Sequence, residues 1–336
     1  MRAYTTLGDG IDKLRQAERP VPEPKAGEVL VKVGAASLNY RDLLVVKGVG
    51  RWKPSTPRVP LSDGAGFVAA VGTRVSRWRV GDRVTGVFMP KWLDGELTAE
   101  KDASPLGGAA ADGVLAEYVT FDEQAVVRTP DGLADAEAAS LPVAALTAWH
   151  AVARRSRVGR GETVLIQGTG GVSLFALQFA SALGGRPLVI SSSDEKLEAA
   201  GKLGAWGTIN YKRFPAWDEQ ALELTGGEGV DHVIEVAGGE NLNRSLNAVK
   251  LSGTISFIGL LAGLSAPVNT FQFVAKNVRL HGIETGSREM FEEMNGFIEA
   301  HGLRPVIDRT FGFDEARAAL ARLESGKHFG KVVIEF

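Results

Sequence analysis

The sequence predicts an α/β protein of two domains, one rich in β-strands and one built as a doubly wound, six-stranded parallel sheet. Three observations predict this fold. A strand, a glycine turn and a helix follow one another at residues 164–184, and strands and helices then alternate to about residue 283. The first 130 residues carry short runs with a period of two, separated by Gly- or Pro-bearing turns. A chain of 336 residues has room for about two such domains.

The glycine turn is the most informative segment of the chain. The strand-like run Val164–Gln167 leads into it, and the apolar residues that follow recur at the three- and four-residue spacings of one helix face. Gly168 permits a tight turn, Gly170 lets the backbone approach a phosphate, and the helix N-terminus attracts a pyrophosphate. Glycines also mark ordinary turns, but this position between a buried strand and an amphipathic helix favours a nucleotide site. The predicted phosphate-binding residues are Gly168, Thr169, Gly170, Gly171 and Val172.

The alternation after the turn is typical of a parallel sheet covered on both faces, because its strands are continuous apolar runs. The expected strands are Val164–Gln167, Pro187–Ser191, Thr208–Tyr211, Val230–Val236, Thr254–Gly259 and Val278–Ile283. The expected helices between them cover residues 172–184, 195–203, 216–225, 240–250 and 270–276.

The β-rich part has no sustained helical period in its first 130 residues, and residues 89–113 read as a long polar loop. Helices are expected to open at Asp135 and over Leu146–Ala153, and the tail is expected to be helical from about Arg288 before it closes with a strand at Lys331–Phe336. The expected early strands are Glu28–Val33, Phe67–Val71, Asp82–Phe88 and Leu115–Phe121.

The composition narrows the chemistry. With 44% hydrophobic residues, 23% charged residues and a net charge of −2, the chain gives no reason to expect nucleic acid or an anionic membrane as a partner. Its start, Met1–Thr5, has no apolar signal core, and no run approaches the ~20 residues of a membrane span, so we expect a cytoplasmic protein. The absence of cysteine excludes disulfides, thiolate nucleophiles and cysteine-built zinc sites. The five histidines form no i,i+4 pair, so no bound metal is expected.

Besides the glycine turn, the chain carries six short motifs in a fixed order. They are Gly27–Val31, Ser37–Asp42, Pro60–Gly66, Val80–Val84, Leu146–Trp149 and Gly330–Ile334. Together they resemble the motifs of the medium-chain dehydrogenases/reductases, in particular the zinc-free, quinone-oxidoreductase-like branch, and the resemblance spans nearly the whole chain. It implies a GroES-like catalytic domain at residues 1–140 and 288–336, a Rossmann dinucleotide-binding domain at 141–287, and an active site in the cleft between them.

The resemblance also implies that zinc is absent. Zinc-dependent members carry a cysteine where this chain has Asn39 and a histidine–glutamate pair where it has Ser62-Asp63. Their four-cysteine structural lobe falls within residues 89–113, which hold no cysteine. Without a metal to polarise a carbonyl, hydride transfer needs an electron-poor acceptor such as a quinone or an enone, and protein donors stabilise the charge that develops.

The residues that the resemblance places near the nicotinamide are the catalytic candidates Asn39, Tyr40, Asp42 and Ser62. Asn39 is expected to donate a hydrogen bond or to hold a water at the former zinc position, and Tyr40 is a donor or a core aromatic. Arg41 and Asp42 form either part of the site or a structural ion pair and helix cap. The tyrosines of quinone reductases are replaced by Leu44 and the region 47–50, so quinone specificity is not implied. Tryptophans that line a pocket or simply pack are Trp52, Trp92 and Trp149.

The type of nicotinamide cofactor is indicated by the end of the second strand of the parallel sheet. NAD-selective sites place an acid there for the ribose 2′-OH, whereas this strand ends in Ser191, Ser192 and Ser193. Asp194 is better explained as an acid of the next helix's first turn or its cap. Lys196 is placed to face a 2′-phosphate, and Tyr211 ends the third strand, as in NADP-binding relatives. These features favour NADP(H) over NAD(H), the alternative being a polar loop with a solvated lysine.

Further cofactor contacts are implied by family position. Two of these residues have an alternative role that does not involve the cofactor. Thr147 would then be a helix residue whose hydroxyl bonds its own backbone, and Lys331 would be a solvated charge on an edge strand. The positions are Thr147, Val236, Ala237, Gly238, Ile258, Gly259, Leu260 and Lys331.

Together these observations predict a zinc-independent, NADPH-dependent oxidoreductase that acts on a small activated carbonyl, enone or quinone. The alternatives are an NADPH-binding, redox-responsive module with little turnover, an NAD-dependent enzyme resembling alcohol dehydrogenase, and a zinc alcohol dehydrogenase with unusual ligands. Because an uncovered strand edge invites pairing and relatives pair at this edge, we expect a homodimer beside Val278–Ile283.

Overall fold

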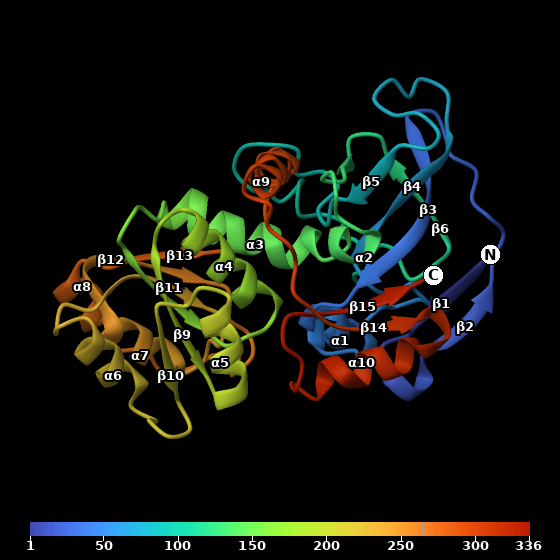
Figure 1. The fold of residues 1–336 in the computed structure, drawn as a ribbon. Coiled ribbons are helices and arrows are strands. Elements are labelled where there is room, and N and C mark those ends of the chain that lie inside the picture. The colour runs from blue at the N-terminus through green and yellow to red at the C-terminus, as the bar shows by residue number, and fades with distance from the viewer. Residues whose placement is uncertain (264) are drawn as a thin grey trace. The chain divides into compact units, whose positions relative to one another are not determined.

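The computed structural model describes residues 1–263 and 265–336 (Figure 1). The chain forms two compact units. The first consists of Met1–Leu146 together with Gly286–Phe336, and the second is Thr147–Thr285.

The second unit contains the predicted six-stranded parallel sheet. Its spatial order is β10-β9-β8-β11-β12-β13, and all neighbouring pairs are parallel. Numbered along the chain, this is the doubly wound order 3-2-1-4-5-6, so the predicted architecture is confirmed. The strands are β8 (Thr163–Gln167), β9 (Arg186–Ser191), β10 (Gly207–Asn210), β11 (Val230–Glu235), β12 (Val249–Phe257) and β13 (Arg279–Gly282).

Helices connect these strands where the sequence predicts them. The central strands carry apolar residues at their middle, as strands of a sheet covered on both faces do; Leu165, Val233 and Ile255 are fully buried in one cluster. The helices are α4 (Gly171–Ala182), α5 (Asp194–Lys202), α6 (Trp217–Leu224), α7 (Asn241–Ala248) and α8 (Phe271–Lys276). They are preceded by a helical stretch made of η3 (Leu141–Ala145), α3 (Leu146–Trp149) and η4 (His150–Ser156).

The first unit is built on a seven-stranded, mostly antiparallel sheet. Its order is β14-β15-β3-β4-β5-β7, with β6 paired to β3. A separate two-stranded sheet pairs β1 with β2. The strands are β1 (Arg2–Thr5), β2 (Arg15–Glu18), β3 (Glu28–Ser37), β4 (Asp63–Val71), β5 (Arg83–Gly86), β6 (Tyr118–Asp122), β7 (Val126–Arg128), β14 (Ile307–Gly312) and β15 (Lys331–Glu335).

Several short elements of this unit lie outside the sequence prediction. The helix α1 (Tyr40–Val46) forms where no helical period was expected, because seven residues make only about two turns and carry little periodic signal. The strands β1, β2, β7 and β14 are short as well. The remaining helical elements are α2 (Asp135–Ala138), α9 (Arg288–His301), α10 (Ala316–Glu324), η1 (Ile11–Lys13), η2 (Gly50–Trp52) and η5 (Phe313–Glu315).

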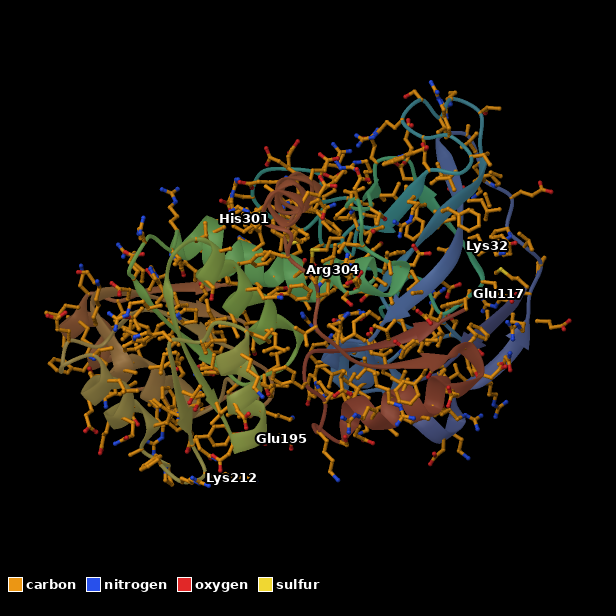
Figure 2. The ribbon with its side chains drawn as sticks, in the orientation of Figure 1. Lys32, Glu117, Glu195, Lys212, His301 and Arg304 are labelled. Atoms are coloured by element: carbon orange, nitrogen blue, oxygen red, sulfur yellow. The ribbon has the colours of Figure 1, made fainter. Side chains whose placement is uncertain are left out.

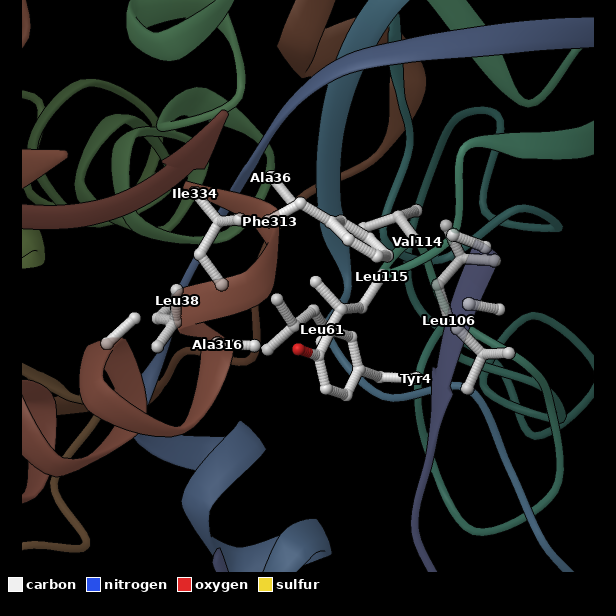
Figure 3. Close-up of a cluster of buried hydrophobic side chains, with 14 of the residues drawn as sticks. Tyr4, Ala36, Leu38, Leu61, Leu106, Val114, Leu115, Phe313, Ala316 and Ile334 are labelled. Carbon is white, nitrogen blue, oxygen red and sulfur yellow. The ribbon is translucent and has the colours of Figure 1, made fainter. Parts of the chain in front are cut away.

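The core of the first unit anchors the segments that carry the candidate site. Strand β3 alternates locally, with Lys32 exposed between buried Val31 and Val33 (Figure 2). Leu38 and Leu61 belong to the same buried cluster, which Figure 3 shows in close-up. Their burial fixes the backbone just before Asn39 and Ser62.

The segment 89–113 contains neither helix nor strand, as predicted. Hydrogen bonds to its own carbonyl groups hold it together. The indole nitrogen of Trp92 donates to the Gly95 carbonyl at 2.8 Å, and the Lys101 ammonium donates to the carbonyls of Asp94 and Glu96 at 2.6 and 3.0 Å. In the described part of the chain, no helix is both long and apolar enough to span a membrane.

Candidate active site and cofactor turn

Strand register brings three distant segments to one end of the first unit's sheet. Ser37, the last residue of β3, lies opposite Asp63 on β4 and opposite Val333 on β15. The residues just beyond this row are therefore neighbours, and they include Asn39, Ser62 and Lys331. Asn39 precedes α1 in extended conformation (φ −125°, ψ 156°), which suits the N-cap position that asparagine favours.

A buried ring of polar contacts joins these residues. The Lys331 ammonium donates to the Leu38 carbonyl at 2.8 Å and to Asn39 Oδ1 at 2.6 Å. Asn39 Nδ2 donates to Ser62 Oγ at 3.4 Å, and Ser62 Oγ donates to Asp63 Oδ1 at 2.8 Å. The ring closes where Asp63 Oδ2 lies 4.0 Å from the Lys331 nitrogen.

Burial shifts the pKa values of the two charged residues in the ring, Asp63 and Lys331. Burial raises the pKa of Asp63, and the Lys331 charge opposes that shift. Burial lowers the pKa of Lys331, and the charges of Asp63 and Asp42 oppose it. Asp63 Oδ2 also accepts a hydrogen bond from the Val143 amide at 3.1 Å, at the start of η3. Each of the two charges thus offsets part of the other's desolvation.

Asp42 positions Asn39 through the backbone. Its Oδ2 accepts from the Asn39 amide at 2.8 Å, and its Oδ1 lies 3.1 Å from an Arg41 guanidinium nitrogen. Burial raises the pKa of Asp42 to about 6, against the opposing effect of Arg41. These contacts are those of the ion pair and helix cap that the sequence left as an alternative. Both carboxylate oxygens of Asp42 therefore have partners within the protein, and a catalytic role for Asp42 stays a prediction.

The aromatic candidates differ in burial. Tyr40 is 42% exposed, which makes it a surface residue of the first unit rather than a core aromatic. Trp92 is buried in the first unit, and Trp149 is buried in the second, where it packs edge-on against Phe179 with ring centroids 5.3 Å apart. The packing interpretation therefore fits Trp92 and Trp149. Trp52 is partly exposed beneath the Arg51 guanidinium.

The glycine turn adopts the geometry that the sequence predicts for it. Gly168 has φ +76°, a conformation that favours glycine, and its amide donates to the Ile190 carbonyl at 2.7 Å. Gly170 is the N-cap of α4, so the unpaired amides of the first helical turn follow it directly. Ser173 stands in the place of a third glycine, and its hydroxyl donates to the Gln167 carbonyl at 2.7 Å. The serine thereby ties the helix to the strand.

The other predicted cofactor residues of the second unit follow neighbouring parallel strands. Because β9, β8, β11 and β12 are adjacent and parallel, their carboxyl ends lie at one edge of the sheet, where ligands of such sheets bind. The turns after β11 and β12 approach closely, since a Cβ added at Gly259 would lie 2.3 Å from the Gly238 nitrogen. Residues at the ends of these strands or just after them are Ser191, Ser192, Ser193, Val236, Ala237, Gly238, Ile258, Gly259 and Leu260.

Sequence reasoning missed a buried acid at this edge. Glu235, the last residue of β11, has no exposed surface. Its Oε1 accepts from the amides of Ala237 and Gly238 at 3.0 and 2.9 Å, and its Oε2 accepts from Gln167 Nε2 at 2.6 Å and from the Ser245 hydroxyl. Glu235 thus links the strand before the glycine turn to the turn after β11. The signal available in the sequence was an acid directly after the apolar pair Val233-Ile234, at the end of a predicted strand.

The end of β9 has no carboxylate in the NAD-type position. Ser193 is the N-cap of α5, with its hydroxyl accepting the Lys196 amide at 3.3 Å. Asp194 is the first-turn acid that the sequence suggested, and it binds Asn210 Nδ2 at 2.7 Å and the Arg213 guanidinium. Tyr211 is 40% exposed just after β10. In Figure 2 the exposed residues Glu195 and Lys212 mark these same two segments.

Two positions implied by family resemblance have specific partners. The Thr147 hydroxyl donates to the Glu284 carbonyl at 3.3 Å rather than to its own helix, so that alternative is wrong. Lys331 is only 3% exposed, so the alternative of a solvated edge-strand charge is also wrong. Its ammonium lies with Asn39 and Asp63, and its contact with a cofactor stays a prediction.

Comparison with known proteins establishes the family. Residues 25–131 match the family model described as alcohol dehydrogenase GroES-like domain, and residues 171–300 match the one described as zinc-binding dehydrogenase. A zinc-type alcohol dehydrogenase-like protein of Schizosaccharomyces pombe is 44% identical over 333 residues, which cover 97% of this chain and 96% of that protein. The 2-methylene-furan-3-one reductase of Solanum lycopersicum is 32% identical over 341 residues, covering 99% of this chain and 78% of that protein.

Solved structures agree with the sequence relatives. The crystal structure of a putative alcohol dehydrogenase from Sinorhizobium meliloti superposes with a TM-score of 0.93 at 44% identity, covering 100% of this chain and 98% of that one. An NAD-dependent alcohol dehydrogenase structure gives a TM-score of 0.90 at 32% identity, covering 100% of both chains. The chain belongs to the medium-chain dehydrogenase/reductase superfamily, with a GroES-like domain and a Rossmann sheet. It is an oxidoreductase of the kind that uses a nicotinamide cofactor on small molecules.

Zinc, which the name of one matching family implies, does not fit the residues at the candidate site. The side-chain ligands there are the oxygens of Asn39, Ser62 and Asp63, whereas zinc favours cysteine and histidine with at most some carboxylate. The Lys331 ammonium already contacts Asn39 Oδ1 and lies beside Asp63. A divalent cation at these oxygens would stand next to that positive charge.

Proposed function

We propose that this chain is a zinc-independent, NADPH-dependent oxidoreductase that reduces a small, electron-poor acceptor, namely an activated carbonyl, an enone or a quinone. The observation that carries the proposal is the ring at the position where the family resemblance places zinc, in which the Lys331 ammonium contacts Asn39 and lies near Asp63, while Ser62 joins those two residues. This ring presents a hydrogen-bond donor rather than a Lewis acid. Such a donor stabilises less charge than a metal does, which favours acceptors that are already electron-poor.

Asn39 is the donor in this mechanism. Its Oδ1 is bound to Lys331, and the hydrogen bond of its Nδ2 to Ser62 is long at 3.4 Å, so the NH₂ group keeps capacity to donate to a substrate oxygen. A bound nicotinamide supplies the hydride. The Asn39 amide group then stabilises the oxyanion or enolate that develops on the acceptor, while Asp42 holds the Asn39 backbone in place.

The preference for NADPH rests on the end of β9. A serine-rich end with Lys196 in the following helix accommodates a 2′-phosphate, and the nearest acid, Asp194, is engaged by Asn210 and Arg213. Both cofactors occur among similar proteins, because one solved structure is of an NAD-dependent alcohol dehydrogenase and another, 25% identical with a TM-score of 0.86, is of a 2-octenoyl-CoA carboxylase reductase in complex with NADP. The name of the tomato relative, a reductase of a methylene ketone, supports an enone as acceptor.

One assay tests the proposal. Purified protein is offered NADPH or NADH with a panel of quinones, enones and activated aldehydes, with and without a zinc chelator, and the loss of nicotinamide absorbance is followed. We expect turnover of at least one acceptor, faster with NADPH, unchanged by the chelator, and no stoichiometric zinc by metal analysis.

Other outcomes distinguish the alternatives. Tight NADPH binding without turnover of any acceptor would support the redox-responsive binding module instead. Faster turnover with NADH would support an NAD-dependent enzyme, and stoichiometric zinc together with loss of activity in chelator would support a zinc alcohol dehydrogenase with unusual ligands.

We also propose that the chain forms a homodimer through the edge of the Rossmann sheet. Strand β13 pairs with β12 on one side, and Leu280 on this strand is exposed. Phe271 and Val274 of α8, the preceding helix, are also exposed. Pairing with a second copy would cover these apolar side chains and the open strand edge.

A further inference from the structure

Lys331 is a buried lysine whose ammonium is directed entirely at protein groups. Two of its N–H groups are used by the Leu38 carbonyl and Asn39 Oδ1, and the Asp63 carboxylate lies on a further side at 4.0 Å. Moving an ammonium group out of water costs desolvation free energy, and these contacts offset only part of that cost. Stability alone does not require them, because an apolar side chain at a buried strand position fills space without that cost.

The contact with Asn39 determines which way the carboxamide faces. An ammonium group has donors and no acceptor, so the Asn39 atom 2.6 Å away from it must be the oxygen. The NH₂ group then faces the opposite direction, toward Ser62. Without the lysine, the two ends of a carboxamide are nearly the same in shape, and either could face the substrate.

Ser62 and Asp63 favour the same orientation of the Asn39 carboxamide. Ser62 Oγ donates its hydrogen to Asp63 Oδ1, so toward Asn39 it offers a lone pair and accepts. Asp63 is fixed in turn by the Val143 amide. Every contact in the ring therefore has the same polarity, from the lysine donor through the carboxamide and the hydroxyl to the carboxylate, and such chains reinforce one another.

We propose that Lys331 is a positioning residue, whose ammonium holds the Asn39 carboxamide with its NH₂ group presented as donor to the substrate oxygen. This inference rests on the proposed function, which makes Asn39 that donor. It differs from the role that family resemblance gives this lysine, which is contact with the cofactor. The two roles predict different kinetic consequences.

The kinetic test compares Lys331→Met, Lys331→Arg, Asn39→Ala and the double variant Asn39→Ala/Lys331→Met, using an acceptor that the wild type reduces. We expect Lys331→Met to lower kcat about tenfold with the NADPH dissociation constant unchanged, and Lys331→Arg to restore most of the loss. Asn39→Ala should lower kcat about 100-fold, and adding Lys331→Met should lower it by less than about twofold more. Additive losses, or weaker NADPH binding with kcat unchanged, would overturn the proposal.

A second measurement tests the positioning role of Lys331 and does not require enzyme activity. Protein labelled with ¹⁵N at asparagine is observed by NMR, and the Asn39 side-chain NH₂ signals are assigned by their loss in Asn39→Asp. We expect these signals to shift in Lys331→Met and to stay in place in Lys331→Arg and in Lys327→Met, which removes an exposed lysine from the preceding turn. Unmoved signals in Lys331→Met would contradict the positioning role, whether or not the wild type turns over any acceptor.

Lys331→Met removes the cation that lies beside the buried Asp63 carboxylate. An unpaired buried charge destabilises the fold, so this variant can fail to fold. The variant Lys331→Met/Asp63→Asn removes both charges together and therefore leaves no unpaired buried carboxylate. It replaces Lys331→Met in the NMR experiment if that variant does not fold. It too should show displaced Asn39 signals. If it shows wild-type signals, Lys331 does not set the orientation of the carboxamide. A wild type without turnover but with displaced signals in the variants would refute the proposed function and leave the positioning role standing.

Discussion

At the scale of single residues, the second unit contains a buried acid, Glu235, that contacts the strand before the glycine turn. Glu235 accepts hydrogen bonds from Gln167, from the amides of Ala237 and Gly238, and from Ser245 of α7. Carboxylate oxygens suit this place because all of these partners donate. One side chain thereby sets the distance between the strand before Gly168 and the neighbouring turn.

We predict that Glu235→Gln destabilises the protein by about 2 kcal/mol, because the new NH₂ group must face other donors in either orientation. The same change should weaken NADPH binding, since the Ala237–Gly238 turn then has at most a neutral amide oxygen as its acceptor in place of a carboxylate oxygen. Urea denaturation and a fluorescence titration with NADPH measure the two effects. Glu240→Gln, an exposed change just beyond the turn, is the control and should leave both unaltered. Wild-type values for Glu235→Gln would show that the network is dispensable.

At the scale of elements, the segment that delivers Ser62 and Asp63 is held in a strained conformation. Leu61 is buried with φ +68°, a left-handed conformation that costs an ordinary residue about 1–2 kcal/mol. Its carbonyl accepts from the Val114 amide at 2.9 Å, and the backbone of Gly113 packs directly against it. Burial of the Leu61 side chain and this backbone contact maintain the strain.

We predict that Gly113→Ala is destabilising by more than about 2 kcal/mol and lowers kcat, because its Cβ would lie 1.9 Å from the Leu61 carbonyl oxygen, which is backbone and cannot move alone. Displacing Leu61 would displace Ser62 with it. Gly296→Ala in α9 is the matched control, since its Cβ meets nothing within 4 Å and a helical alanine adds about 0.5–1 kcal/mol. Thermal unfolding and steady-state kinetics of both variants check this. Equal behaviour of the two would disprove the steric argument.

At the scale of the whole molecule, the feature that bears on assembly is the edge of the parallel sheet at β13. Strand β13 carries exposed Leu280, and the preceding helix exposes Phe271 and Val274. An apolar strand edge of this kind associates with a partner or aggregates.

We predict a dimer of the wild type by light scattering and a monomer for Leu280→Lys, because a buried lysine at a paired edge is strongly unfavourable. Val80→Lys, which changes an exposed residue of the first unit, should remain a dimer. A monomeric wild type would count against assembly at this edge, and a dimeric Leu280→Lys would place the interface elsewhere.

The parts of the fold that were predictable are those with strong local signals. The six strands of the Rossmann sheet could be predicted because each is an apolar run bounded by turns, and the glycine turn because its conformation requires glycine. The strands β1, β2, β7 and β14 and the helix α1 could not, since three to seven residues carry little periodicity and form through pairing with distant partners. Glu235 escaped prediction for a similar reason, because an acid in a strand is usually exposed.

By itself, the sequence determined the superfamily, the parallel sheet with its glycine turn, and the absence of cysteine and histidine from the positions that the family resemblance matches to zinc ligands, Asn39 and Ser62-Asp63. Those properties follow from residue types and local spacing. Only the tertiary structure decided that Lys331 joins that position, because 292 residues separate it from Asn39 and the two meet through the register of β15 against β3. The register between two strands that are distant in sequence cannot be predicted from a local residue pattern. The cation beside Asn39 is therefore a product of strand pairing.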